Sequence, residues 1–278
     1  MKQVIVITGL AEGMGKQTAL ILARKGHAVA GFDRDARGID VLKKDLDRIG
    51  TEHLLQSLDI QDRSGVAEFS NSVLDRFGRA DTVLSNVGTG FFGPFEEIDL
   101  EKARTCFEIN VFGAAAIFQA FIPSMRVRRN GKLIAMSSLV GQIPFPFESI
   151  YTATKFALEG LMESIRYEVA PFGIKTALIE PAQVSTGFAA KIHHLPPENS
   201  PYRERVRRFI QRDEELIRNA PTPAKAAERI VKVVLSRTPK FRNPVDFTGS
   251  LFLTANRILP KRIRDAILLN HMRIQVKK

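Results

Sequence analysis

Short apolar runs rich in β-branched residues alternate with longer amphipathic stretches through the first two thirds of the chain. The runs predict strands at residues 4–8, 28–33, 53–58, 82–85, 132–136 and 174–179. Between them, apolar residues recur every three or four positions, which predicts helices at 16–25, 41–49, 66–77, 100–125 and 149–170. Such alternation is typical of a doubly wound parallel sheet with right-handed crossovers. The sequence therefore predicts a single α/β domain over residues 1–278.

The pattern changes after the sixth predicted strand. Residues 190–223 contain a His- and Pro-rich segment and then a charged helix, which we interpret as a substrate lid inserted over the carboxyl edge of the sheet. Residues 240–278 form a basic C-terminal extension. No linker precedes about residue 190, and both segments are assigned to the same domain.

The composition is that of a globular protein, because 44% of the 278 residues are hydrophobic and 26% are charged. The single cysteine, Cys106, cannot form an internal disulfide, and no segment has the form of a signal peptide. The longest uncharged stretch, 109–125, includes polar residues and is shorter than the ~20 apolar residues of a membrane-spanning helix. We therefore predict a buried helix there and a cytoplasmic protein.

The net charge of +11 is unevenly distributed. Nine basic and two acidic residues lie between 240 and 278, so +7 belongs to the extension. Apolar and basic residues intermix from 257 to 272, as in a helix that lies on an anionic membrane, although packing on the body of the protein is the favoured interpretation. Contact with an acidic carrier protein is a third option. Without interleaved aromatic residues or a recognition motif, no nucleic-acid partner is expected.

A glycine-rich turn follows the first predicted strand and opens the first helix. It reads Thr8-Gly-Leu-Ala-Glu-Gly-Met-Gly-Lys16, with glycines at 9, 13 and 15. Glycines in this context allow a tight turn, close approach of a pyrophosphate and close packing of the helix, whose free N–H groups favour an anion. The loop predicts a dinucleotide-binding site.

The chain resembles the short-chain dehydrogenase/reductase family in the spacing of this loop, T-G-x-x-x-G-x-G, and in four further features spread over most of its length. These are Ser85-Asn86-Val87-Gly88 after the fourth strand, Asn110 in the long helix, Ser138 with Tyr151-x-x-x-Lys155, and the run Pro181 to Thr186. The resemblance implies a Rossmann-like fold. It also implies a catalytic set of Asn110, Ser138, Tyr151 and Lys155, and a cofactor site of Gly9, Gly13, Met14, Gly15, Asp33, Arg34, Asp59, Ile60, Asn86, Val87, Gly88, Tyr151, Lys155, Pro181, Val184 and Thr186.

The catalytic set has a chemical rationale. Tyr151 and Lys155 are four residues apart on a helix and therefore share a face, where the ammonium group favours the phenolate. Ser138 can donate a hydrogen bond to a developing alkoxide. The resemblance implies that Asn110 holds a water that links Lys155 to solvent. The five histidines have no ligand spacing, so no metal is predicted.

The end of the second strand bears on the choice of nicotinamide cofactor. Asp33 favours NAD, because a carboxylate accepts hydrogen bonds from the ribose hydroxyls and repels a 2′-phosphate. Arg34 favours NADP instead, since an arginine can bind that phosphate. Glu12 adds a second acidic residue in the phosphate loop. NAD is therefore the predicted cofactor, with NADP as the alternative.

The C-terminal third and the stretch Y-T-A-T-K-F-A-L-E-G at 151–160 are similar to the steroid- and retinol-dehydrogenase branch of the family. This resemblance implies a hydrophobic secondary alcohol or ketone as substrate and a homodimer or homotetramer. Aromatic residues and a proline at 91, 92, 95 and 145–147 are candidates for an apolar pocket. The alternatives are a ketoreductase of carrier-bound acyl chains and a non-catalytic dinucleotide-binding regulator.

Overall fold

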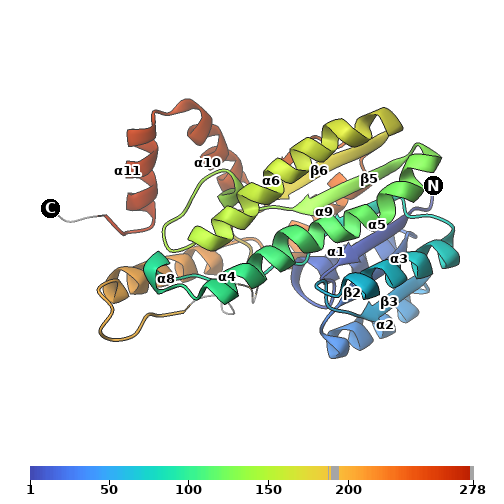
Figure 1. Ribbon diagram of the computed structural model, residues 1–278, viewed down its shortest axis with the longest axis horizontal. Helices are drawn as coiled ribbons and strands as arrows, with labels where there is room; N and C mark the ends of the chain where they lie inside the picture. The colour runs from blue at the N-terminus through green and yellow to red at the C-terminus, as the bar shows by residue number, and fades with distance from the viewer. Residues whose placement is uncertain (187, 189–193, 276–278) are drawn as a thin grey trace.

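Seven parallel strands form one twisted sheet at the centre of the computed structural model, which describes residues 1–186, 188 and 194–275 (Figure 1). The strands are β1 (Val4–Thr8), β2 (Ala28–Asp33), β3 (His53–Ser57), β4 (Thr82–Ser85), β5 (Gly131–Met136), β6 (Ile174–Glu180) and β7 (Arg242–Pro244). Their order is β3-β2-β1-β4-β5-β6-β7. The chain adds β2 and β3 on one side of β1, and then crosses over to add β4 and the later strands on the other side. Ligands of such sheets bind outside the carboxyl ends of the strands at this crossover point, between β1 and β4.

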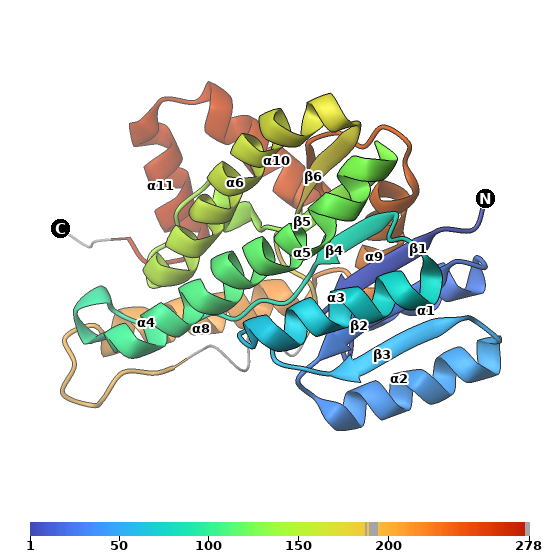
Figure 2. The ribbon, with the colours of Figure 1, turned by 45° about the vertical axis from the view of Figure 1, so that its right-hand side comes forward.

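Helices cover both faces of the sheet (Figure 2). One face packs against α3 (Arg63–Phe77), α5 (Gly113–Arg128) and α6 (Ser149–Val169). The other packs against α1 (Gly13–Arg24), α2 (Ala36–Ile49) and α9 (Pro223–Leu235). Alternate residues of β1 face opposite cores, since Val4 and Val6 lie in the first and Ile5 and Ile7 in the second. The predicted doubly wound, Rossmann-like domain is confirmed.

The uncharged stretch at 109–125 lies in the core. It forms most of α5, which follows α4 (Leu100–Phe107) and a π-helical turn, η2 (Glu108–Phe112). The continuous helical run Leu100–Arg128 is long and apolar enough to cross a membrane by length and composition. Its side chains Ile117, Phe118 and Phe121 are nevertheless completely buried against the sheet. A buried helix therefore accounts for the stretch, as the sequence predicts.

The C-terminal third covers the carboxyl edge of the sheet. Its helices besides α9 are α8 (Arg203–Arg218), α10 (Phe247–Ile258) and α11 (Lys261–His271). Short turns elsewhere are η1 (Phe95–Glu97), η3 (Leu139–Gly141) and η4 (Ala170–Phe172). A third apolar cluster joins these helices to the body, with Phe209, Met272 and Ile274 all completely buried. The segment from 240 first forms β7 at the edge of the sheet, so only its later part extends from the body. Residues 190–193 of the predicted lid lie outside the described residues, as do Lys277 and Lys278.

Candidate active site

A cavity of about 650 Å³ opens along the carboxyl ends of the strands, from the loop after β1 to the start of α6 and the side of α8. This volume lies within the range of small-molecule sites. All the predicted site residues line the cavity except Gly15 and Asn110, which lie directly behind its wall. The structure therefore brings together residues that are spread over 178 positions, from Gly9 to Thr186.

The backbone conformation and packing of the glycine loop require glycine at three positions. Gly9 and Gly13 have left-handed backbones with φ of +71° and +58°. A Cβ on Gly15 would lie 2.1 Å from the Gly9 carbonyl oxygen, so the first turn of α1 can pack here only with glycine. Asn86 Nδ2 fixes the same carbonyl by donating a hydrogen bond at 2.7 Å.

The residues of this loop fit the phosphates of a dinucleotide. No described side chain caps the N-terminus of α1, where Glu12 occupies the N-cap position in an extended conformation. The first N–H groups of α1 therefore face the cavity without a competing side-chain oxygen, and the helix dipole favours an anion there.

The adenosine end is shaped by the ends of β2 and β3. The Asp33 carboxylate accepts hydrogen bonds from the backbone N–H groups of Ala11, at 3.1 Å, and Asp35, at 3.0 Å. Asp33 thereby ties β2 to the glycine loop and places a negative charge beside the exposed Arg34. Asp59 accepts from the N–H of Gln61 at 2.9 Å, and the neighbouring Ile60 is buried.

Tyr151, Lys155 and Ser138 meet at the centre of the cavity. The Lys155 Nζ donates a hydrogen bond to the Met136 carbonyl at 2.7 Å and lies 5.6 Å from the centroid of the Tyr151 ring. Burial lowers the pKa of Lys155 to about 8, although the Glu159 carboxylate opposes the shift. Burial, and then the negative charge of Glu148, raise the pKa of Tyr151 above its ordinary value, while the hydrogen bond with Ser138 acts against them.

Asn110 lies in the π-helical turn, a feature that is frequent at functional sites. Its Nδ2 donates to the Thr89 carbonyl at 2.8 Å and to Thr154 Oγ1 at 2.9 Å, and its Oδ1 accepts from the Thr89 N–H at 2.8 Å. The side chain therefore joins the loop after β4 to α6 at the level of Lys155. The inserted π turn was not predicted, because a helical period cannot show a single extra residue.

The far end of the cavity is apolar and lies over Tyr151. The rings of Phe92 and Phe188 each lie 5.8 Å from the Tyr151 ring, and Phe145 joins them in the lining. Among the other aromatic candidates, Phe147 packs on Phe209 of the third apolar cluster. Phe91 contacts His194, and Phe95 is 69% exposed, so neither they nor Phe147 line the cavity.

Two buried carboxyl groups in this apolar end were missed by the sequence analysis. Glu148 immediately precedes α6, and Asp213 reaches the cavity from α8. Glu148 lies three residues before Tyr151, and this helical spacing could have predicted that the two side chains share a face. Asp213 carried none, because its approach depends on how α8 folds back over the sheet.

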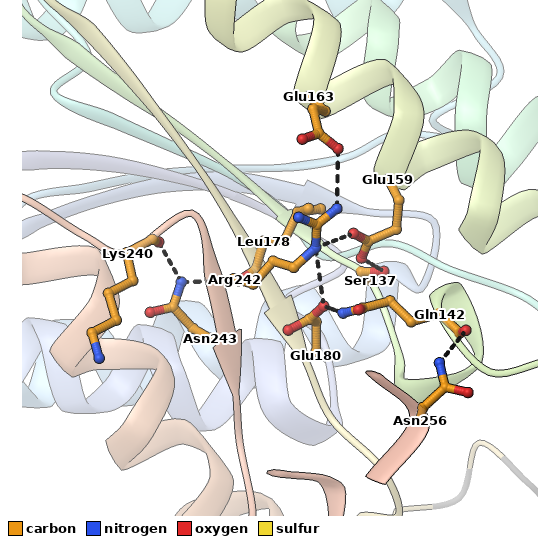
Figure 3. A network of polar contacts seen from close by, with 10 residues as sticks. All are labelled: Ser137, Gln142, Glu159, Glu163, Leu178, Glu180, Lys240, Arg242, Asn243 and Asn256. Atoms are coloured by element: carbon orange, nitrogen blue, oxygen red, sulfur yellow. Dashed lines mark hydrogen bonds and ion pairs between the residues drawn. The ribbon is translucent and has the colours of Figure 1, made fainter. Parts of the chain in front are cut away.

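A polar network includes Ser137, which follows β5 and directly precedes Ser138 (Figure 3). Ser137 Oγ donates to Glu159 Oε1 at 2.6 Å. Arg242 from β7 donates to Glu159 at 3.1 Å and Glu163 at 3.2 Å, and lies 3.8 Å from Glu180 Oε1. Burial raises the pKa of Glu180 to about 7 and also raises that of Glu159. One arginine thus serves three carboxyl groups.

The same network reaches the C-terminal helices. The Gln142 side-chain amide donates to Glu180, and the Asn256 side chain donates to the Gln142 carbonyl at 3.3 Å (Figure 3). The turn that carries Ser138 is therefore attached both to β6 and to α10.

A doubly wound sheet, a phosphate-binding glycine loop and a buried Tyr–Lys–Ser cluster in one cavity are features of NAD(P)-dependent oxidoreductases. Residues 3–195 match the model of the family described as short chain dehydrogenase. The chain belongs to the short-chain dehydrogenase family. It is therefore an oxidoreductase that uses a nicotinamide dinucleotide.

Known proteins resemble the chain over nearly its whole length. A 3-ketodihydrosphingosine reductase from Bacteroides thetaiotaomicron is 34% identical over 269 residues, which cover 96% of both chains. Retinol dehydrogenase 8 from Bos taurus is 30% identical, with 92% of this chain and 89% of that protein covered. The crystal structure of a short-chain dehydrogenase from Streptomyces avermitilis superposes with a TM-score of 0.82 at 32% identity, covering 96% of this chain and 94% of that one.

Proposed function

We propose that this protein interconverts a hydrophobic ketone and the corresponding secondary alcohol, with NAD as cofactor. The observation that carries the proposal is the apolar end of the cavity, where Phe92, Phe145 and Phe188 stand over Tyr151. An apolar chain or ring system seated there has its carbonyl beside the Tyr151 and Ser138 hydroxyl groups. The names of the Bacteroides and Bos taurus relatives, which refer to a ketosphingoid reductase and a retinol dehydrogenase, agree with a lipid substrate.

The proposed roles follow from the protonation states in the site. The bound nicotinamide supplies or accepts the hydride. Tyr151, whose pKa is raised by burial, remains protonated and donates its proton to the oxygen of the substrate during ketone reduction. Ser138 donates a second hydrogen bond to the same oxygen. The Lys155 ammonium group places a positive charge close to the Tyr151 phenol. Asn110 positions the loop after β4, beside which a water can reach Lys155.

The proposal of NAD rests on Asp33 together with Glu12. Asp33 is held in place by two backbone N–H groups, so it cannot easily swing away from a 2′-phosphate at the end of β2. A fixed carboxylate repels that phosphate and accepts from ribose hydroxyls. Arg34 lies beside it and is exposed, which leaves it able to stack on the adenine ring.

A panel of ketones assayed with both cofactors tests these proposals. Polycyclic, retinoid, long-chain acyl and carrier-bound ketones are offered with NADH and with NADPH, and loss of absorbance is followed. We expect turnover of a free long-chain or polycyclic ketone and a catalytic efficiency about tenfold or more higher with NADH, equal to ~1.4 kcal/mol. Turnover of the carrier-bound ketone alone supports the ketoreductase, and cofactor binding without turnover of any substrate supports the regulator.

We propose that residues 190–223 act as the substrate lid of a single domain. The support comes from α8, which supplies Asp213 and Ile217 to the cavity and packs Phe209 beneath Phe92 and Phe147. We also expect a homodimer or homotetramer, as the family resemblance implies, and a cytoplasmic protein, as the sequence analysis predicts.

The corner formed by α10 and α11 is the proposed membrane contact. The two helices project beyond the sheet at the end away from the N-terminus (Figure 1). Their inner sides pack on the body through Leu253 and Met272, which agrees with the favoured interpretation of the sequence. Their outer sides expose four large apolar residues, between 43% and 73% accessible, next to exposed basic groups: Leu251, Ile258, Ile263 and Ile267, with Arg257 and Arg262. Apolar and cationic side chains together fit an anionic lipid surface.

Sedimentation with lipid vesicles tests this contact. The protein is expected to bind vesicles that contain phosphatidylserine and not vesicles of phosphatidylcholine alone. The double variant Ile258→Gln/Arg262→Gln should bind about tenfold more weakly, because it loses one exposed aliphatic side chain that inserts into the lipid and one cation. Val127→Gln, at an 82% exposed position on α5, is the control. Equal sedimentation of the double variant and the control contradicts the assignment.

A further inference from the structure

We propose that Glu159 is a positioning residue that holds Ser138 in place through the neighbouring Ser137. Arg242 keeps the Glu159 carboxylate oriented for this contact. Glu159 is buried and does not line the cavity, so it affects the reaction only through other residues. This inference rests on the proposed function, because the positioned hydroxyl group is the one that donates to the substrate oxygen.

Two consecutive residues that lead into Ser138 are attached to one face of α6. Lys155 and Glu159 are four residues apart on this helix and therefore share that face. The Lys155 Nζ donates a hydrogen bond to the carbonyl of Met136, the last residue of β5, at 2.7 Å. Glu159 Oε1 accepts from the hydroxyl group of Ser137 at 2.6 Å. The helix that carries the catalytic lysine therefore also fixes the chain directly before Ser138.

The turn that follows Ser138, η3, packs on the same pair. A Cβ on Gly141 would lie 2.6 Å from the Ser137 Oγ and 3.1 Å from the Glu159 Cγ, so the turn approaches both side chains closely. The Ser138 Oγ accepts from the Val140 N–H in this turn at 3.3 Å. The position of the Ser138 hydroxyl group therefore depends on backbone that the pair contacts on both sides.

The Glu159 carboxylate is itself fixed at both oxygens. Oε1 accepts from Ser137, and Oε2 accepts from the Arg242 Nε at 3.1 Å. Burial raises the pKa of Glu159, whereas the hydrogen bond from Ser137 and the charge of Arg242 act against this shift and favour the ionised form. Hydrogen bonds to an ionised group are shorter and stronger than neutral ones. With a side chain only 7% exposed, Glu159 therefore holds the Ser137 hydroxyl group where little water competes for it.

Single-turnover kinetics of two variants at position 159 test the assignment. Enzyme with bound NADH is mixed rapidly with a ketone that the wild type reduces, and nicotinamide absorbance is followed. Glu159→Met should lower the rate constant of hydride transfer about tenfold at unchanged amplitude, because Ser138 is displaced and not removed. A lower amplitude with an unchanged rate constant would mean fewer folded molecules and overturns the inference.

Glu159→Gln separates positioning from charge. The Glu159 carboxylate also raises the pKa of Lys155, and both variants remove that effect. The glutamine keeps a carbonyl oxygen that can accept from Ser137, so its rate constant should stay within about threefold of the wild type. Equal losses in the glutamine and methionine variants would show that Glu159 acts through its charge, which overturns the inference.

Glu163→Met is the matched control. Glu163 lies one helical turn further along α6 and contacts the same Arg242 at 3.2 Å, but its side chain is 43% exposed. This variant should retain the wild-type rate constant within about twofold. Ser137→Ala should reproduce the loss of Glu159→Met, and the double variant should be no slower than either, because all three lose one contact. Losses that multiply in the double variant contradict an action through Ser137.

Hydrogen exchange gives a readout that needs no substrate. The backbone N–H groups of residues 139–143 all donate hydrogen bonds. Their exchange should be about tenfold faster in Glu159→Met than in Glu163→Met. If the wild type reduces no ketone, the proposed function fails and exchange decides: faster exchange supports the inference, and equal exchange overturns it. If the wild type reduces a ketone, an unchanged rate constant in Glu159→Met overturns the inference and leaves the proposed function intact.

Discussion

Tyr151→Phe is expected to lower kcat/KM by about 10³-fold while cofactor binding is unchanged. The substitution removes one oxygen atom that lies at the centre of the cavity, beside Ser138 and Lys155, and retains the ring that packs on Phe92 and Phe188. General acid–base catalysis by a positioned side chain is worth about 10² to 10⁴ in rate. The loss should appear in kcat, because an apolar substrate is bound by the aromatic lining and not by the phenol.

The control for this variant is Tyr167→Phe, which makes the same change on the same helix at a position that is 68% exposed. Turnover is followed by nicotinamide absorbance and cofactor binding by isothermal titration calorimetry. If Tyr151→Phe keeps more than about a tenth of the activity, another group transfers the proton and the role proposed for Tyr151 is wrong. If it loses cofactor binding as well, its role is structural.

Most of the fold was predictable because its signals are local. The bounds of β1, β2 and β4 coincide with the apolar runs in the sequence, since each of these central strands is buried on both faces. The end of α2 at Gly50 and that of α3 at Gly78 follow from glycines that adopt a left-handed backbone there. The catalytic and cofactor residues were predicted from the resemblance to a family, and all of them except Gly15 and Asn110 line the cavity.

The features that sequence reasoning missed depend on long-range packing. Asn110 occupies a π turn whose extra residue leaves no periodic trace. The three-residue strand β7 contains Pro244 and was not predicted, since a short edge strand with a proline has little strand signal. Asp213 reaches the cavity only through the placement of α8, and Glu148 was overlooked because a carboxylate before a helix resembles an ordinary cap.

The interaction of Arg242 with three carboxyl groups is another contact between residues far apart in the sequence. The Glu159 and Glu180 side chains are only 7% and 1% exposed, whereas that of Arg242 is 29% exposed. Glu180 Oε2 is buried and has no hydrogen-bond partner within the described residues. Removal of the arginine therefore leaves the buried Glu159 and Glu180 carboxyl groups without this counter-ion, next to Ser137 at the end of β5.

Arg242→Met is accordingly expected to lower the free energy of unfolding by about 3 kcal/mol, measured by urea denaturation, the lower end of the range for breaking a buried ion pair. The loss should grow with pH. The pKa of Glu180 in the folded protein is about 7, above its ordinary value of 4.5, so the stability that it contributes is present below pH 4.5 and is lost as the pH rises through 7. The arginine lowers the pKa of both Glu159 and Glu180, and without it both values rise further.

The difference between wild type and Arg242→Met should therefore be larger at about pH 8 than at about pH 5. Glu180→Gln, combined with Arg242→Met, should recover part of the lost stability at the higher pH, because a neutral amide needs no counter-ion. The control is Arg229→Met on the exposed side of α9. A pH-independent loss would mean that Arg242 stabilises the fold mainly by packing on Phe241, over whose ring its guanidinium lies at 5.0 Å, and not by neutralising the carboxyl groups.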